Sequence, residues 1–135
     1  MNSHINSFNI VSEEFFQKLL KTFPNENKFS VYYTNFIAAK TFSNRLPVEY
    51  IMNNMKDYGY WILTRDEKFF KSDNIISMAE SFSEKSGLVD IWESMDNKIK
   101  NNVWEYIQSM YVLGMRSMEL DDELNNIIEK IKVKS

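Results

Sequence analysis

Residues 86–118 read SGLVDIWESMDNKIKNNVWEYIQSMYVLGMRSM and give the clearest indication of the fold. Their large apolar residues recur in steps of one, three and four, which is the period of an α-helix and not of a strand. Asp96 is a residue type that favours helix N-termini, so the stretch predicts a short helix over 88–95 and a long helix over 97–118. At about 1.5 Å per residue the long helix would span about 33 Å, roughly the width of a small domain. The residues of this stretch expected to form the core are Trp92, Ile99, Val103, Trp104, Ile107, Met110 and Tyr111.

The rest of the chain continues the helical pattern. Ser12, with two acidic residues directly behind it, favours a helix start, and Pro24 favours its end. A second helix is expected over 27–41, and a third is expected to begin at Pro47 and end at Gly59. A short helix is expected after a capping box formed by Thr64 and Glu67. Two more helices are expected to begin at residue 72 or 73 and at Asp121. We therefore predict an all-α fold, a compact single-domain bundle of about six or seven helices over residues 12–135, arranged around the helix at 97–118. Residues 1–11 are expected to form a mobile N-terminal segment.

Composition excludes several kinds of chemistry. The chain has 135 residues, which suits one domain, and it contains no cysteine and one histidine, His4. Disulfides, thiol nucleophiles and multi-histidine metal sites are therefore ruled out. The three glycines stand far apart, so no phosphate-binding loop is present. No apolar run approaches the length of a membrane span. We expect a protein that is not an enzyme, has no cofactor and has no membrane segment.

The charge pattern argues against nonspecific binding to nucleic acid. Net charge is −3, and residues 46–96 carry ten acidic and five basic side chains, a net of −5. Such binding needs clustered basic residues. An alternative surface for nucleic acid nevertheless exists in the C-terminal part, where basic side chains are interleaved with Trp104 and Tyr106. Its candidate contacts are Lys98, Lys100, Arg116, Lys130, Lys132 and Lys134.

Three smaller features each allow a structural and a functional interpretation. The acidic cluster Glu119, Asp121, Asp122 and Glu123 could bind a divalent cation, but it lacks the glycine turn of a calcium loop and suits the start of a helix. Asp66 and Glu67 could be a catalytic pair, but adjacent helical positions point about 100° apart. Gly114 indicates either the close approach of a neighbouring helix or room for a ligand.

The order of bulky residues suggests an origin. Ile62, Asp66-Glu67 and Phe69-Phe70 are followed by Leu88, Ile91-Trp92, Lys98, Val103-Trp104, Tyr106-Ile107 and Met110-Tyr111. This pattern, over roughly residues 62–114, resembles short uncharacterised proteins of large nucleocytoplasmic (giant) DNA viruses. Asn and Lys, at 15 and 13 residues, far outnumber Arg and Ala, at three each, which indicates an AT-rich gene. The resemblance implies action in the infected cell or packaging in the virion, and it implies no catalytic residue.

These observations favour a non-enzymatic helical protein-interaction module, an adaptor of viral origin. Catalytic groups are missing, while eight Met, seven Tyr and three Trp are types enriched at protein interfaces. The expected partner is another viral or host protein, with a homodimer as a variant. The expected location is the cytoplasm of the infected host cell or the virion. The alternative is a nucleic-acid-associated or virion-core structural protein.

Overall fold

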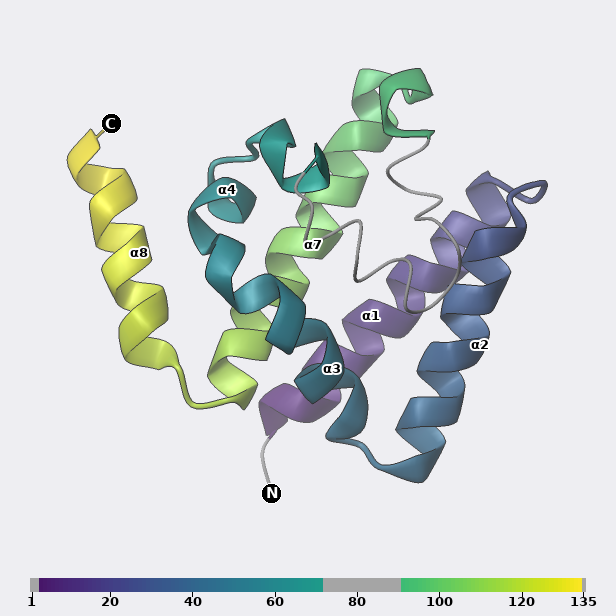
Figure 1. Ribbon diagram of the computed structural model, residues 1–135, viewed down its shortest axis with the longest axis horizontal. Helices are drawn as coiled ribbons and strands as arrows, with labels where there is room; N and C mark the ends of the chain where they lie inside the picture. Colours follow the sequence, from purple (N-terminus) through teal and green to yellow (C-terminus); the bar gives the residue numbers. More distant parts are fainter. Residues whose placement is uncertain (1–2, 72–90, 135) are drawn as a thin grey trace.

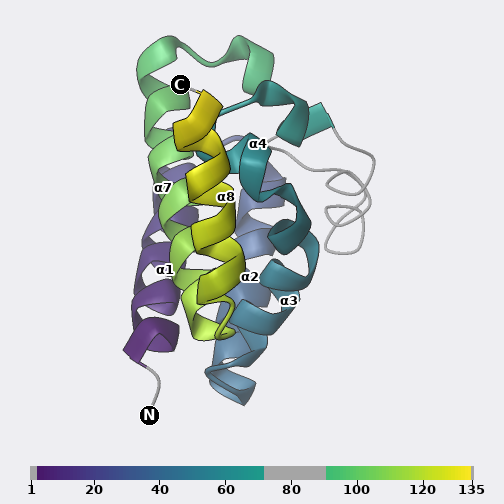
Figure 2. The same cartoon turned by 90° about the vertical axis from the view of Figure 1, so that its left-hand side faces the viewer.

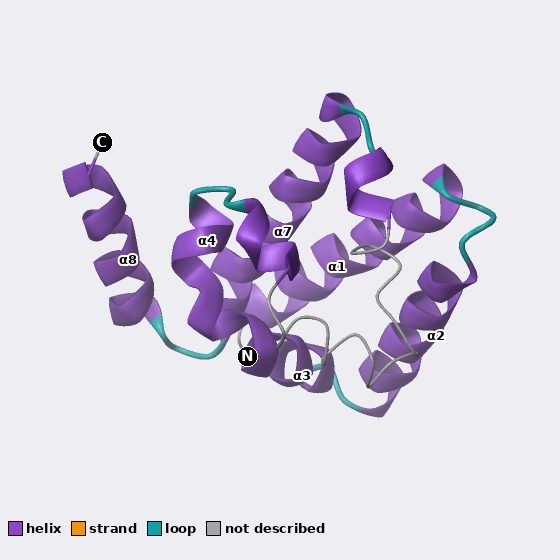
Figure 3. Cartoon of the chain, turned by 45° about the horizontal axis from the view of Figure 1, so that its top comes forward, coloured by secondary structure: helices purple, strands orange, loops and turns teal. Residues whose placement is uncertain are grey.

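The computed structural model describes residues 3–71 and 91–134, and every regular element within them is helical, which confirms the all-α class (Figure 3). The elements, in chain order, are α1 (Ser3–Thr22), α2 (Asn27–Phe42), α3 (Leu46–Met55), the 3-10 helix η1 (Lys56–Tyr58), α4 (Gly59–Leu63), the 3-10 helices η2 (Glu67–Lys71) and η3 (Trp92–Ser94), α7 (Asn97–Ser117) and α8 (Asp121–Lys134). Within the described ranges, five helices reach ten residues or more: α1, α2, α3, α7 and α8. Six or seven helices were expected for the whole chain, so the described residues account for five long helices of that number. The helix expected from residue 72 or 73 lies outside the described residues.

Helix α7 is the predicted central helix, and it packs against α1, α3, α4 and α8 (Figure 1). Its start is set by Asp96, whose Oδ1 accepts a hydrogen bond from the backbone N–H of Ile99 at 2.9 Å. Its last residue, Ser117, lies one position before the predicted end. Six of the seven predicted core residues in this region are buried, and Ile99 is half-buried against them. The long helix and its apolar face are therefore confirmed.

Helix α1 begins at Ser3, so the prediction of a helix start at Ser12 is wrong. Ser12 lies in the middle of the helix and is fully buried, and residues 3–11 belong to the packed domain and are not a separate segment. Phe8 and Ile5 continue the apolar face of Phe15 and Leu19 by about two and three turns toward the N-terminus, and all four are buried. Burial of that face against α7 outweighs the local preference of a serine for a helix N-terminus.

Two glycines mark places where helices approach closely. A Cβ added at Gly114 would lie 2.2 Å from the Sδ of Met52, so α3 passes directly over α7 there. Of the two interpretations of Gly114, the structure therefore supports the close approach of a neighbouring helix. A Cβ added at Gly59 would lie 2.0 Å from the hydroxyl of Tyr111. Gly59 does not end a helix as predicted: α3 ends at Met55, and Gly59 is the first residue of α4. Its small size lets α4 lie against α7.

Helix α8 is the most peripheral helix of the described chain. It lies at one edge of the molecule and contacts α4 and α7 (Figures 1 and 2). Its chain direction is opposite to that of α7, so its C-terminal end lies at the same end of the bundle as the start of α7 (Figure 2). The turn between the two helices spans three residues, 118–120.

Candidate functional site

The pair Asp66 and Glu67 is not a joint carboxylate site. Asp66 Oδ1 accepts a hydrogen bond from the backbone N–H of Lys68 at 3.0 Å and so caps the turn of η2. Glu67 instead accepts from the indole Nε1 of Trp92 and lies 3.7 Å from the Nζ of Lys100. The two carboxylates therefore serve different partners, which gives no support to a catalytic pair.

The capping box predicted at Thr64 and Glu67 is wrong. Thr64 follows the last residue of α4, and its hydroxyl donates back to the carbonyl of Tyr60 at 2.7 Å. Arg65 then adopts a left-handed conformation, with φ of 56°, and the chain turns toward η2. The side chain of Arg65 holds this turn against α7, because its guanidinium donates to the side-chain oxygens of Asn101 and Gln108 at 2.6–3.3 Å. Sequence reasoning missed this link because Asn101 and Gln108 carry no local signal for it.

An aromatic cluster lies beneath Glu67, and its contacts are structural. Phe70 stacks on Trp92 with ring centroids 4.1 Å apart, and the rings of Trp92 and Trp104 meet edge to face at 5.7 Å. Lys100 places its Nζ 5.3 Å from the centroid of the Trp92 ring. Trp92 and Trp104 are almost fully buried. Because the rings pack on one another, they are not available as a platform for stacking bases.

The basic residues proposed for nucleic acid do not gather into one patch. Lys98 and Lys100 lie in the first turn of α7, whereas Arg116 lies in its last turn, eighteen residues and about 27 Å away. Lys100 is engaged with Glu67, and Lys132 forms an ion pair with Glu129 at 3.7 Å. Lys130 is exposed on α8, and the side chain of Lys134 lies outside the described part of the structure. The alternative function receives no support from this arrangement.

The acidic cluster at residues 119–123 lies at the start of α8. Asp121, Asp122 and Glu123 occupy the first turn of that helix and are exposed, a position where negative charge stabilises the helix. Glu119 lies in the preceding turn. Among residues 3–71 and 91–134, no three acidic or histidine side chains come together as a group that could hold a metal ion.

The Tyr111 hydroxyl is the most unusual polar group of the core. It is fully buried between α4 and α7 and has no hydrogen-bond partner among the described residues. Burial, together with the charges of Glu123 and Asp57, raises the pKa of Tyr111 to about 12. A shallow open depression lies nearby on the surface, lined by Asp57, Tyr58, Tyr60 and Trp61. Its lining residues are one aspartate, two tyrosines and one tryptophan.

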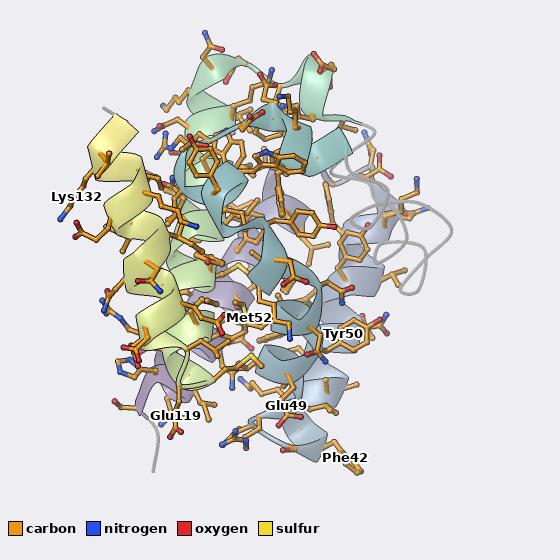
Figure 4. All side chains as sticks on the ribbon, turned by 60° about the vertical axis from the view of Figure 1, so that its left-hand side comes forward. Phe42, Glu49, Tyr50, Met52, Glu119 and Lys132 are labelled. Atoms are coloured by element: carbon orange, nitrogen blue, oxygen red, sulfur yellow. The ribbon has the colours of Figure 1, made fainter. Side chains whose placement is uncertain are left out.

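Exposed apolar side chains lie along α2 and on the first two turns of α3. Phe42, the last residue of α2, is 85% exposed and points away from the ribbon, and Tyr50 lies on the neighbouring helix (Figure 4). Val31 lies on the same side of α2 as Phe42, eleven residues earlier, and Leu46 lies one turn before Tyr50 on α3. All four are exposed, and we call them the α2–α3 surface. The apolar periodicity of α2 did not predict this surface, because the apolar residues of α2 are spread around the whole helix.

Comparison with known proteins adds no assignment: no family model, curated protein or solved structure matches the chain. The resemblance to giant-virus proteins therefore stays a prediction. Among the described residues, no helix combines the length and apolar character that crossing a membrane requires.

Proposed function

We propose that this protein is a non-enzymatic helical module that binds another protein through the α2–α3 surface. The observation that carries the proposal is the exposure of Phe42. A phenylalanine side chain that is 85% exposed keeps most of its apolar area in water, at a cost of about 1.5–3 kcal/mol relative to full burial. Aromatic side chains that enter a pocket on a partner recover this energy, and they are typical anchors of protein interfaces.

The neighbouring groups suit such an interface. Leu46 and Tyr50 add apolar area on α3, while Arg45 and Glu49 form an ion pair at 3.4 Å on the same helix turn. An apolar centre with charged groups at its edge is the usual composition of a protein-binding surface. The proposal includes the viral origin: the partner is a viral or host protein, met in the cytoplasm of the infected cell or in the virion.

The proposal can be tested by affinity purification from the native host cell, followed by binding measurements with the purified partner. The variant is Phe42→Ser, and the matched control is Val133→Ser, because Val133 is exposed to nearly the same extent, 83%, but lies on α8. We expect Phe42→Ser to weaken binding by at least about tenfold, as for an anchoring aromatic residue, and Val133→Ser to leave it unchanged. Equal binding by both variants and the parent protein would contradict the proposal, as would the recovery of no partner at all.

A further inference from the structure

The turn that joins α7 to α8 has a backbone conformation that its sequence does not favour. The backbone N–H of Leu120 donates to the carbonyl of Met115 at 2.8 Å, and that of Glu119 donates to the carbonyl of Arg116 at 3.1 Å. This is the Schellman pattern of a helix end, in which the left-handed residue is usually glycine. Here the left-handed residue is Glu119, with φ of 60°. Side chains with a Cβ are strained in this conformation.

The residues of this turn are strong helix formers. Met118, Glu119 and Leu120 all rank near the top of helix propensity, and none of them is a residue that breaks helices. Leu120, directly before α8, also has no side-chain oxygen to accept a hydrogen bond from the first turn. Local preference thus favours a helix that continues from α7 into α8. Packing of α8 onto the bundle is what holds the turn bent.

Arg65 provides an internal comparison. It adopts a similar left-handed conformation, but its guanidinium is tied to Asn101 and Gln108 by hydrogen bonds. The side chain of Glu119 is exposed, and no described residue forms a hydrogen bond or ion pair with it. The bent conformation at Glu119 is therefore maintained by the backbone turn and by the contacts of α8.

Those contacts of α8 are limited. Of its apolar residues, Leu124 is fully buried, whereas Ile127, Ile128 and Ile131 are half-buried. The surface that receives the helix is shaped for it: the terminal methyl of Ile127 lies so close to Gly59 that a Cβ there would come within 2.9 Å of it. This surface would accept the same helix from another molecule equally well, because the contacts would be identical.

We propose that α7 and α8 can straighten through residues 118–120 into one helix over 97–134, and that two copies of the chain then exchange α8. Each α8 would occupy the surface on α4 and α7 of the other copy, so the apolar contacts are kept while the strain at Glu119 is removed. Asp121 and Asp122 oppose this change, because they stabilise the separate N-terminus of α8. The partner in this proposal is a second copy, and the contact does not involve the α2–α3 surface.

Distance measurements between spin labels test the exchange directly. The chain has no cysteine, so Asn102→Cys and Lys132→Cys introduce two unique, exposed labelling sites on α7 and α8. Asn102 lies in the second turn of α7 and Lys132 in the last turn of α8. Because these helices run in opposite directions in the bent form, both sites lie at the same end of the bundle (Figure 2). In a straight helix they lie thirty residues and about 45 Å apart. The protein is partly unfolded, refolded at high concentration and separated into monomer and dimer by size. Labelled chains are mixed with an excess of unlabelled chains, so that each measured distance lies within one chain.

A dimer fraction with a distance of about 45 Å within each chain supports the proposal. A monomer under all conditions overturns it, and so does a dimer that keeps the shorter distance. Glu119→Gly relieves the left-handed strain and weakens the straight helix, so it should lower the dimerisation constant by at least about tenfold. Lys130→Gly is the control, because it weakens α8 equally in both forms and should leave the constant unchanged. Equal dimerisation by Glu119→Gly and the parent chain also overturns the proposal.

Discussion

Glu67 accepts a hydrogen bond from the indole nitrogen of Trp92, a residue 25 positions further along the chain. This bond joins η2 to η3 and places an acceptor beside an almost fully buried aromatic ring. Lys100, whose Nζ is 3.7 Å from Glu67 and 5.3 Å from the Trp92 ring centroid, completes the contact from α7. Three elements are thereby held at one end of the bundle.

Substitution of Glu67 should therefore lower the free energy of unfolding more than substitution of an exposed acidic residue usually does. Glu67→Leu leaves the Trp92 indole N–H without an acceptor, and we expect a loss of about 1–3 kcal/mol in the free energy of unfolding. Glu67→Gln keeps an acceptor and should lose less than half as much. Chemical denaturation followed by tryptophan fluorescence measures both. Glu105→Leu, which changes an exposed glutamate on α7, is the control. Equal effects of the leucine variants would show that the hydrogen bond contributes little.

Gly114 should not tolerate even a methyl group. An added Cβ would collide with the Met52 side chain, so Gly114→Ala is expected to destabilise the protein by about 1–3 kcal/mol, although alanine favours a helix. Combining it with Met52→Val should recover part of the loss, giving a coupling of about 1 kcal/mol in a double-mutant cycle. Ser109→Ala, at an exposed site of the same helix, should be neutral or slightly stabilising. Additive effects of the Gly114 and Met52 changes would contradict the proposed contact.

Tyr111 should make stability depend on pH in the alkaline range. Its pKa is raised from 10.0 to about 12 in the folded protein, so folding favours the neutral phenol. This contribution is fully present below pH 10 and is lost as the pH rises through about 12. The Tyr111→Phe variant should therefore lose less stability than the parent protein as the pH rises from 10 to about 12. At neutral pH its stability should equal or exceed that of the parent, because the substitution removes an unpaired buried hydroxyl. Thermal unfolding across the pH series measures the difference, and parallel curves for the two proteins would count against it.

The Asp96 cap should contribute measurably to α7. Asp96→Ala removes the acceptor for the Ile99 N–H and should cost about 1 kcal/mol, whereas Asp96→Asn retains an acceptor and should cost only a few tenths. Asp121→Ala is a useful comparison, since that residue acts on α8 by charge in its first turn. Equilibrium denaturation checks both substitutions. An alanine variant as stable as the parent would show that the helix start is set by packing alone.

Sequence alone determined the helical class, the start of α7 at Asn97 and five of its buried positions, although it missed Met115 and Ser117. These follow from apolar periodicity and from a capping residue, which act within a few residues of one another. Sequence did not predict the start of α1, because the buried face of Ile5 and Phe8 outweighed the signal of Ser12. It also could not assign Glu67 to Trp92 or Gly59 to Tyr111, since those contacts depend on which helices meet.

The exposed surfaces were decided by the tertiary structure as well. Phe42 and Phe36 are the same residue type on the same helix, yet one is 85% exposed and the other is buried. Only the arrangement of α1 and α3 around α2 distinguishes them. In the same way, Met118, Glu119 and Leu120 favour a continuous helix, and the packing of α8 on α4 and α7 bends the chain there. Local physics determines which segments become helices and where α7 begins, while burial of shared apolar area determines where α1 begins, where the chain bends between α7 and α8, and which side chains remain outside.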